Sequence, residues 1–363
     1  MMILSVVSFI CILGLLVLVH EFGHFIVARL NGVQVDEFGF GFPPRLFGKK
    51  FGKTLYSVNA IPLGGFVKIK GVIEENDEPH HQQSDDFMAK SLWRRFAILI
   101  AGIVMNYLLT IGLFAVGYMI GMPSNIDQLP PGATVSNPTI LVADISADTP
   151  AAQAGLKISD SVVAVDGKTV SSVVAVKDIL KTVLPNSPIK LAIKRDQTIL
   201  ELNTSTIQLA DGSAGIGAYF VESGTVRLPW YRAIIEATRY TNKFAVAILQ
   251  ALGGLILGAF HGVDVSSSVS GPVGIARITY QATQLGFIYL LQLAGMLSIN
   301  LAIFNLLPFP PLDGGKLIFV VVEAIIRRPV PTKWQIIVHN IGFVIFLLFI
   351  MAVTIKDVVG LVR

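Results

Sequence analysis

The chain has 363 residues, of which 53% are hydrophobic and 14% are charged, and its formal net charge is +4. Its mean hydropathy of +0.68 lies far outside the usual range of soluble globular domains. The basic residues are scattered and form no block, so we expect no nucleic-acid partner. Cys11 is the single cysteine, which excludes an intramolecular disulfide and a cysteine-based metal cage. These properties indicate a membrane protein.

Four charge-free stretches predict transmembrane helices, because each approaches or exceeds the ~20 residues that cross a bilayer. The first precedes no small-residue cleavage site and follows no basic segment, so we interpret it as a retained helix and not a signal peptide. The stretches are 1–19, 96–126, 278–312 and 340–355, and with flanking residues they define spans at 1–28, 96–126, 278–313 and 339–357.

Residues 29–95 form a polar connection that contains a strand-like pattern. Residues 54–60 alternate between apolar and polar side chains, and the alternation resumes at 66–70 after the Pro/Gly segment 62–65. This pattern predicts a β-hairpin, which we expect to be membrane-associated. The segment 74–86 is acidic and polar, as is typical of a loop.

Residues 127–210 are predicted to form a small β-rich domain. Strand-like runs at 140–145, 161–165 and 189–193 are separated by turn signals. The stretch 149–162, which begins Thr-Pro-Ala-Ala-Gln-Ala-Gly-Leu, resembles the PDZ domains of bacterial proteases. That family usually has glycine where this chain has Ser159.

Residues 211–277 are predicted to be a linker that contains an amphipathic helix. Charged residues at spacings of four, three and four fall on one helical stripe, and they are Arg232, Glu236, Arg239 and Lys243. This pattern indicates a helix lying in the membrane interface. The alternative is an ordinary amphipathic helix packed on the β-rich domain. The apolar run 244–260 is borderline in length for a span.

The candidate chemistry begins at the end of the first apolar run. His20, Glu21 and His24 form an H-E-x-x-H pattern, and on a helix two histidines at i and i+4 face the same way. Both imidazoles can chelate one zinc ion, and Glu21 beside them can take a proton from the water that the metal activates. Alternatively, His20 and Glu21 mark the point where the helix leaves the bilayer. Ionisable residues inside the membrane favour the functional interpretation.

A catalytic zinc ion needs a third protein ligand, and Asp313 is the candidate. It follows the longest charge-free run, in the segment Asn-Leu-Leu-Pro-Phe-Pro-Pro-Leu-Asp-Gly-Gly. Prolines free backbone groups at membrane depth, which is tolerated where protein or a cavity surrounds them. Such a broken helix suits binding of an extended peptide, with Asn305 as a hydrogen-bonding partner for its backbone. The remaining histidines lie outside the apolar runs and are expected to be solvated: His80, His81, His261 and His339.

Taken together, an H-E-x-x-H pattern at the end of the first span, an N-x-x-P-x-P-x-L-D-G pattern in a later span and a PDZ-like module between them resemble the site-2 protease family. Within it, the chain is most similar to the bacterial regulator-of-sigma-E type, with room for one PDZ module. The resemblance implies that His20, His24 and Asp313 bind Zn2+, that Glu21 is the general base and that Asn305 positions substrate.

The resemblance also implies a place for the polar connection near the active site. The loop 39–41 and the predicted hairpin are expected to lie there, where the hairpin edge can receive an extended substrate strand.

The shared zinc ion constrains the topology. His20 and Asp313 each follow an apolar run, so both helices must run in the same direction, with an odd number of spans between them. This favours four spans in total, with 244–260 interfacial or re-entrant. Residues 29–95 carry ten Lys and Arg and 314–338 carry four. The positive-inside rule then places these loops and the zinc site toward the cytoplasm, and the PDZ module outside. The resemblance implies that the membrane is a bacterial inner membrane.

The leading functional hypothesis is therefore intramembrane hydrolysis of a peptide bond in single-pass transmembrane proteins. The resemblance implies regulated intramembrane proteolysis, such as cleavage of an anti-sigma factor after an upstream site-1 protease has acted, with the PDZ module as a gate. The alternative is a PDZ-bearing membrane scaffold with a structural zinc site, which would need four protein ligands. A metal transporter would need more ionisable residues at mid-span.

Overall fold

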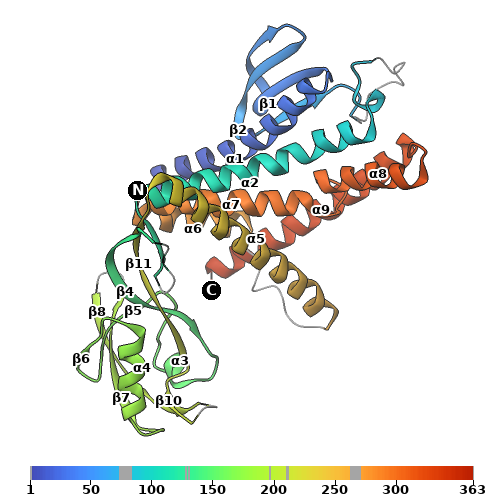
Figure 1. The fold of residues 1–363 in the computed structure, drawn as a ribbon. Coiled ribbons are helices and arrows are strands. Elements are labelled where there is room, and N and C mark those ends of the chain that lie inside the picture. The colour runs from blue at the N-terminus through green and yellow to red at the C-terminus, as the bar shows by residue number, and fades with distance from the viewer. Residues whose placement is uncertain are drawn as a thin grey trace. The chain divides into compact units, whose positions relative to one another are not determined.

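The computed structural model describes residues 2–72, 84–126, 129, 131–195, 198–209, 212–261 and 271–362. Two compact units are present (Figure 1). The first comprises Met1–Val116 and Ile234–Arg363, and the second comprises Gly117–Ala233. Most of the predicted acidic loop, including His80 and His81, lies outside the described residues.

The first unit is built mainly from long apolar helices. Lipid cannot hydrogen-bond to backbone groups, so apolar runs fold as helices that satisfy those groups internally. The last residues of α2 and the first residues of α5 are assigned to the second unit. The helices are α1 (Met2–Leu30), α2 (Leu92–Ile120), α5 (Trp230–Phe260), α6 (Pro272–Leu285), α7 (Phe287–Leu306), α8 (Asp313–Ile326) and α9 (Thr332–Val362), with a short 3-10 helix, η1, at Phe87–Ala89.

Five helices in the described residues are long and apolar enough to cross a membrane: α1, α2, α5, α7 and α9. Four spans are predicted from the sequence, and the additional candidate is α5. The predicted amphipathic segment and the borderline run 244–260 form this one continuous helix. Ile234 and Ile235 are about half exposed on it, whereas Ala237 and Thr241 are fully buried. The helix thus packs through one face, which includes the small side chains Ala237 and Thr241, while Ile234 and Ile235 lie on its outer face.

Hydrogen bonds between α1 and α2 show that these helices run antiparallel. His24 donates from Nδ1 to the carbonyl oxygen of Ile98 at 2.8 Å. One turn earlier in α1, Nδ1 of His20 lies 3.3 Å from Nδ2 of Asn106, two turns later in α2. The contact therefore moves toward the end of α2 as it moves toward the start of α1, which is the pattern of antiparallel helices.

α2 and α7 are antiparallel for the same kind of reason. The hydroxyl of Ser298 donates to the carbonyl oxygen of Asn106 at 2.9 Å, and the hydroxyl of Thr110 donates to that of Gly295 at 3.3 Å. Since α1 and α7 both oppose α2, they run in the same direction, as a metal site shared between His20 and Asp313 requires.

α5 also opposes α2, and therefore runs in the direction of α1 and α7. The Tyr240 ring packs edge-to-face on Phe114 with 5.0 Å between centroids, and the Tyr107 hydroxyl donates to Asn242 at 2.7 Å.

α6, which precedes α7, has 14 residues. A helix of that length rises about 21 Å, which is less than the ~30 Å hydrocarbon core of a bilayer.

The polar connection forms an antiparallel sheet from β1 (Val35–Phe51) and β2 (Thr54–Ile69), which packs on α1 (Figure 1). It differs from the predicted hairpin, because 54–60 and 66–69 belong to the same strand and do not pair with each other. Phe38 pairs with Tyr56 on one side and with Val67 on the other, so the first half of β1 lies between the two halves of β2. The predicted loop 39–41 is part of β1.

The second unit is a β-rich domain, as predicted, and is larger than residues 127–210. Its main sheet has the strand order β3-β11-β4-β5-β7-β8, and β6 pairs with β5. β9 and β10 form a separate two-stranded sheet. The strands are β3 (Met122–Asn125), β4 (Thr134–Ile145), β5 (Ser161–Val165), β6 (Lys168–Thr169), β7 (Pro188–Arg195), β8 (Thr198–Ser205), β9 (Ile207–Gln208), β10 (Ala214–Gly215) and β11 (Ala218–Arg227), and the helices are α3 (Pro150–Gln153) and α4 (Val173–Thr182).

β11 explains the difference in the domain boundary. It falls in the segment predicted to be a linker, yet it lies inside the main sheet between β3 and β4. Phe220 and Val226 are buried on it. Residues 211–229 therefore belong to the β-rich unit, and the predicted linker is reduced to the part of the chain that follows.

The turn before β5 contains the Ser159 position noted from the sequence. Ser159 has a φ of 74°, in the left-handed region that glycine adopts without strain. Asp160 follows, with a side chain 2% exposed, and accepts hydrogen bonds from Lys157 N and from Nε and Nη2 of Arg195. Burial opposes ionisation of Asp160, but the hydrogen bonds from Arg195 and Lys157 outweigh it and hold the pKa of the carboxyl below its ordinary value.

Candidate metal centre

The two histidines of the H-E-x-x-H pattern lie inside α1, which continues beyond them to Leu30. Because they are four residues apart, their rings share one face of the helix, and this face is directed inward: His20 is 6% exposed and His24 is 5% exposed. Polar side chains buried in apolar surroundings need partners. The partner that both rings share comes from almost 300 residues further along the chain.

That partner is Asp313, the first residue of α8. α7 ends at Leu306, and the segment that follows contains three prolines, which cannot continue a helix. The chain then turns tightly into α8. A Cβ on Gly314 would collide with the carbonyl oxygen of Leu307, so glycine is required there. The broken helix thus brings the carboxylate of Asp313 into the space beside α1.

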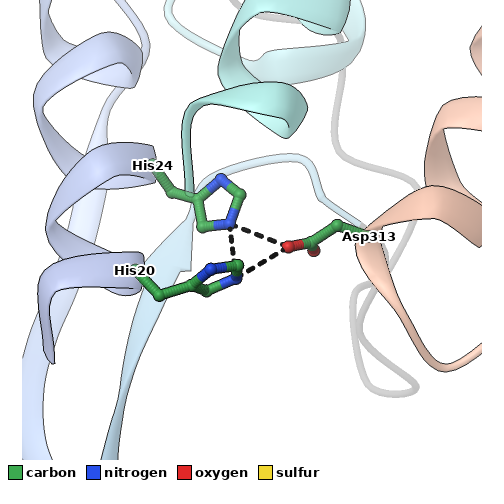
Figure 2. A group of neighbouring side chains, drawn as sticks. All are labelled: His20, His24 and Asp313. Atoms are coloured by element: carbon green, nitrogen blue, oxygen red, sulfur yellow. Dashed lines mark hydrogen bonds and ion pairs between the residues drawn. The ribbon is translucent and has the colours of Figure 1, made fainter. Parts of the chain in front are cut away.

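Figure 2 shows the three side chains converging. Oδ2 of Asp313 lies 2.9 Å from Nε2 of His20 and 2.9 Å from Nε2 of His24, and the two Nε2 atoms are 3.2 Å apart. Ligand atoms of all three residues lie within 4.8 Å of one another. Among the residues that the structure describes, no other group of histidine, cysteine and carboxylate ligands of this kind is found.

The chemistry of these donors fits a metal ion. His24 donates from Nδ1 to a backbone carbonyl, so its Nε2 presents a lone pair to Asp313 when the ring is neutral. Two imidazole lone pairs and a carboxylate oxygen that face one another attract a cation. Two nitrogens and one carboxylate oxygen are a usual ligand set for catalytic zinc, with the fourth position left for water or substrate. The residues present therefore fit zinc.

Glycine at position 102 of α2 makes room for this arrangement. A Cβ at Gly102 would collide with Nε2 of His24 and would lie 2.8 Å from Cε1 of His20. α1 and α2 also approach closely at Gly23, where a Cβ would lie 2.5 Å from the carbonyl oxygen of Ala101. Any larger residue at position 102 would displace the imidazoles.

Asn106 is a residue of the site that the sequence argument missed. It is fully buried, and its Nδ2 lies 3.3 Å from Nδ1 of His20, while its Oδ1 is buried with no partner. For His20 to bind a metal through Nε2, its Nδ1 must carry a proton and donate it. The nitrogen and oxygen of an amide are assigned from their hydrogen bonds, so we assign the oxygen of Asn106 to the position facing His20. The signal in the sequence is an amide side chain within the charge-free run 96–126.

The two other predicted site residues, Glu21 and Asn305, are not part of the cluster formed by His20, His24 and Asp313. Glu21 is partly exposed, and within the described residues it makes no hydrogen bond or ion pair, although its carboxylate interacts electrostatically with His20, His24 and Asp313. Asn305 lies in the last turn of α7, partly exposed, and no hydrogen bond joins it to these three residues.

Two further histidines can be compared with the sequence expectation of solvated side chains. His261 is exposed. His339 is partly buried and donates from Nδ1 to the carbonyl oxygen of Pro310 at 3.1 Å.

We expect Asn106→Ala to weaken zinc binding by about 10- to 100-fold, the usual effect of removing a hydrogen-bond partner behind a metal-binding histidine. Zinc affinity of the purified chain is measured by competition with a chromogenic chelator, so the readout does not depend on activity. Asn300→Ala is the matched control, because among the described residues the Asn300 amide donates only to Met296 O of its own helix. Equal zinc affinities for the two variants would show that Asn106 does not orient His20.

Comparison with known proteins supports the same chemistry. The family model of peptidase family M50 matches residues 8–349. A protein of Clostridium acetobutylicum named as a candidate zinc metalloprotease is 34% identical over 361 residues, covering 98% of this chain and 97% of its own length. A similarly named protein of Clostridium perfringens is 33% identical over 345 residues, with 95% of each chain covered. The zinc metalloprotease RasP of Geobacillus kaustophilus is 28% identical over 436 residues, with 98% and 97% covered.

Among solved structures, the PDZ domain of an SdrC-like protein from Listeria innocua is similar to part of the chain. It has 22% sequence identity and a TM-score of 0.22, and the match covers 23% of this chain and 92% of that domain. The match of the M50 model over nearly the whole length decides the family. The chain belongs to peptidase family M50, the site-2 protease family, and is a zinc metalloprotease.

Proposed function

We propose that this metalloprotease hydrolyses a peptide bond in or beside the transmembrane segment of single-pass membrane proteins. The observation that carries the proposal is the depth of the ligand set. His20 and His24 lie within an apolar helix of 29 residues, and Asp313 joins them from a broken helix, all three being buried. Ionisable residues at such a position mark a functional site by default.

The proposed roles of the residues follow from their chemistry. His20, His24 and Asp313 hold the zinc ion, which when bound acidifies water and polarises a carbonyl group. Glu21 takes the proton of the attacking water and passes it to the leaving amine. Its partial exposure and its freedom from other hydrogen bonds among the described residues suit a group that must exchange protons.

The substrate must present an extended backbone, because a helical segment keeps its amide groups internally bonded. Asn305, without a partner in the described residues, binds the substrate backbone beside the broken end of α7. The β1–β2 sheet supports the same proposal, because it packs on α1, the helix that carries Glu21. An extended segment adds to an edge of this sheet as a further strand.

The topology proposed from the sequence has four spans, α1, α2, α7 and α9, in a bacterial inner membrane. The antiparallel order of α1, α2 and α7 supports this count. α5 runs in the same direction as α7, and α6 between them is shorter than a span, so an interfacial or re-entrant α5 keeps the chain on one side. The positive-inside rule then places the zinc site toward the cytoplasm and the β-rich unit outside.

The β-rich unit is proposed to be a PDZ domain that filters substrates. In this scheme an upstream site-1 protease trims the external part of an anti-sigma factor or a similar single-pass protein, and the shortened product reaches the zinc site. The alternative, a scaffold with a structural zinc site, is less favoured because the described residues supply three protein ligands and not four.

We expect Glu21→Gln to retain zinc and to lower the cleavage rate by about 10²- to 10⁴-fold, the usual contribution of a general base. The measurement pairs bound zinc with single-turnover cleavage of a single-pass substrate in reconstituted vesicles. Gln34→Ala is a control that changes a side chain bonded only to Asp36 among the described residues. Unreduced cleavage by the Glu21 variant would refute the assigned base.

We expect a reporter inserted after His261 to be external, as a reporter at 168 should be, and one at 329 to be cytoplasmic. This outcome follows if α5 enters the membrane interface and does not cross. Paired reporters active on only one side of the membrane, compared in intact cells, provide the measurement. A cytoplasmic location of the His261 reporter would establish α5 as a fifth crossing and would require a return crossing before α7.

A further inference from the structure

A cavity of about 380 Å3 opens within the first unit, and Lys316, three residues after Asp313, is one of its lining residues. It lies among the first turns of α2 and α9, three residues of α8 (Lys316, Phe319 and Val320) and the turn after β2. Its lining combines apolar side chains with a few polar ones. The polar lining residues are Arg95, Lys316, Gln335, His339 and Asn340, and the larger apolar ones are Phe87, Met88, Leu99, Phe319, Ile336 and Phe343.

The charged groups in this lining are both cations. None of the described residues that line the cavity is acidic. Lys316 is 39% exposed at its side chain and lies 3.5 Å from Oδ1 of Asp313, longer than an ideal hydrogen bond. Its ammonium group therefore remains accessible to a ligand.

Arg95 is the second cation, and most of its hydrogen-bonding capacity is unused. Its side chain is 6% exposed, and Nη1 donates to Glu323 at 2.6 Å. A guanidinium carries five N–H donors, yet within the described residues this is its one hydrogen bond, and Nε is buried with no partner. Glu323 is fully engaged, because its other oxygen accepts from Val330 N. The cavity thus offers hydrogen-bond donors, and none of its described lining residues carries a carboxylate that would repel an anion.

The surroundings place the cavity at the membrane interface. Trp93 and Trp334, in the first turns of α2 and α9, are 75% and 61% exposed, as is typical of the aromatic belt at headgroup level. Exposed basic residues flank the same helix ends: Arg94, Arg327, Arg328 and Lys333. A basic pocket between transmembrane helices at this level is the arrangement that binds anionic lipid headgroups.

We propose that this cavity binds the phosphate headgroup of an anionic phospholipid, through Lys316 and the unused donors of Arg95. The headgroup phosphate takes the position between the two cations, and the acyl chains leave along the apolar lining formed by Phe319, Ile336 and Phe343. A phosphate diester is available in this setting both on a lipid and on a free glycerol phosphate. The apolar lining and the level of the cavity favour the lipid.

The test uses the purified full chain in neutral micelles, with lipid binding measured by native mass spectrometry. The chain is titrated with dioleoyl phosphatidylglycerol, with dioleoyl phosphatidylcholine, and with free glycerol phosphate as a competitor. We expect phosphatidylglycerol to bind at least tenfold more tightly than phosphatidylcholine, and glycerol phosphate not to displace it at equal concentration.

Variants locate the site. Lys316→Gln should weaken phosphatidylglycerol binding by about fivefold, the effect of one basic residue at a lipid surface. Arg95→Gln combined with Glu323→Gln removes the second cation without leaving a buried unpaired carboxylate, and should weaken binding to a similar degree. Arg94→Gln is the matched control, because it removes the same charge from the same turn of α2 but does not line the cavity.

Three outcomes would overturn the proposal. Equal weakening by Arg94→Gln and Lys316→Gln would mean diffuse attraction of the lipid to a basic surface. Displacement by glycerol phosphate alone would identify a phosphate site that does not recognise lipid. Unchanged binding in Lys316→Gln and in the Arg95/Glu323 double variant would place the lipid elsewhere. Because lipid binding is measured directly, any loss of zinc or activity in Lys316→Gln does not affect the result.

Discussion

The structure of the first unit depends on the convergence of three electron-pair donors in an apolar surrounding. His20, His24 and Asp313 direct lone pairs at one another within 3.2 Å. In a low-dielectric setting such an arrangement is unfavourable without a cation among the donors. The family of zinc metalloproteases to which the chain belongs accounts for that cation. Much of the helix packing can be understood as what keeps these donors at the same depth.

Several local features follow from this constraint. α7 must run parallel to α1 and must end early, so that Asp313 begins a new helix at the level of the two histidines. Gly102 must lack a side chain, because a Cβ would occupy the space of the imidazoles. The Asn106 side chain lies beside Nδ1 of His20, and the carbonyl oxygen of Ile98 accepts a hydrogen bond from Nδ1 of His24. Each of these residues acts on the site without belonging to the H-E-x-x-H pattern itself.

The sequence predicted the parts of the site that depend on local spacing. The pairing of His20 with His24 follows from helix periodicity, and Asp313, at the end of a long charge-free run, is the predicted third ligand that the structure brings beside both rings. The parallel direction of the two helices then followed from geometry alone. Asn106 was missed because one amide in an apolar helix has no periodic pattern, and its role appears only when α2 packs on α1.

For strands, the sequence predicts which segments are extended but not which segments pair. Alternation revealed that 54–60 and 66–70 are extended, but pairing depends on long-range register, and the first half of β1 lies between them. Phe38, Phe40 and Phe42 alternate with Gly39 and Gly41, so a signal of period two is present in the segment expected to be a loop. β11 was assigned to a linker for a related reason. Its place in the sheet depends on partners some 80 residues earlier in the chain.

The central claim is that His20, His24 and Asp313 jointly hold the zinc ion. X-ray absorption at the zinc edge of the purified chain tests this most directly, because it reports the ligand atoms and their distances. The account predicts nitrogen and oxygen ligands only, at about 2.0–2.2 Å, with an imidazole contribution from two rings, and loss of the bound zinc in Asp313→Ala. A sulfur ligand at about 2.3 Å, or the same zinc spectrum in Asp313→Ala, would contradict it.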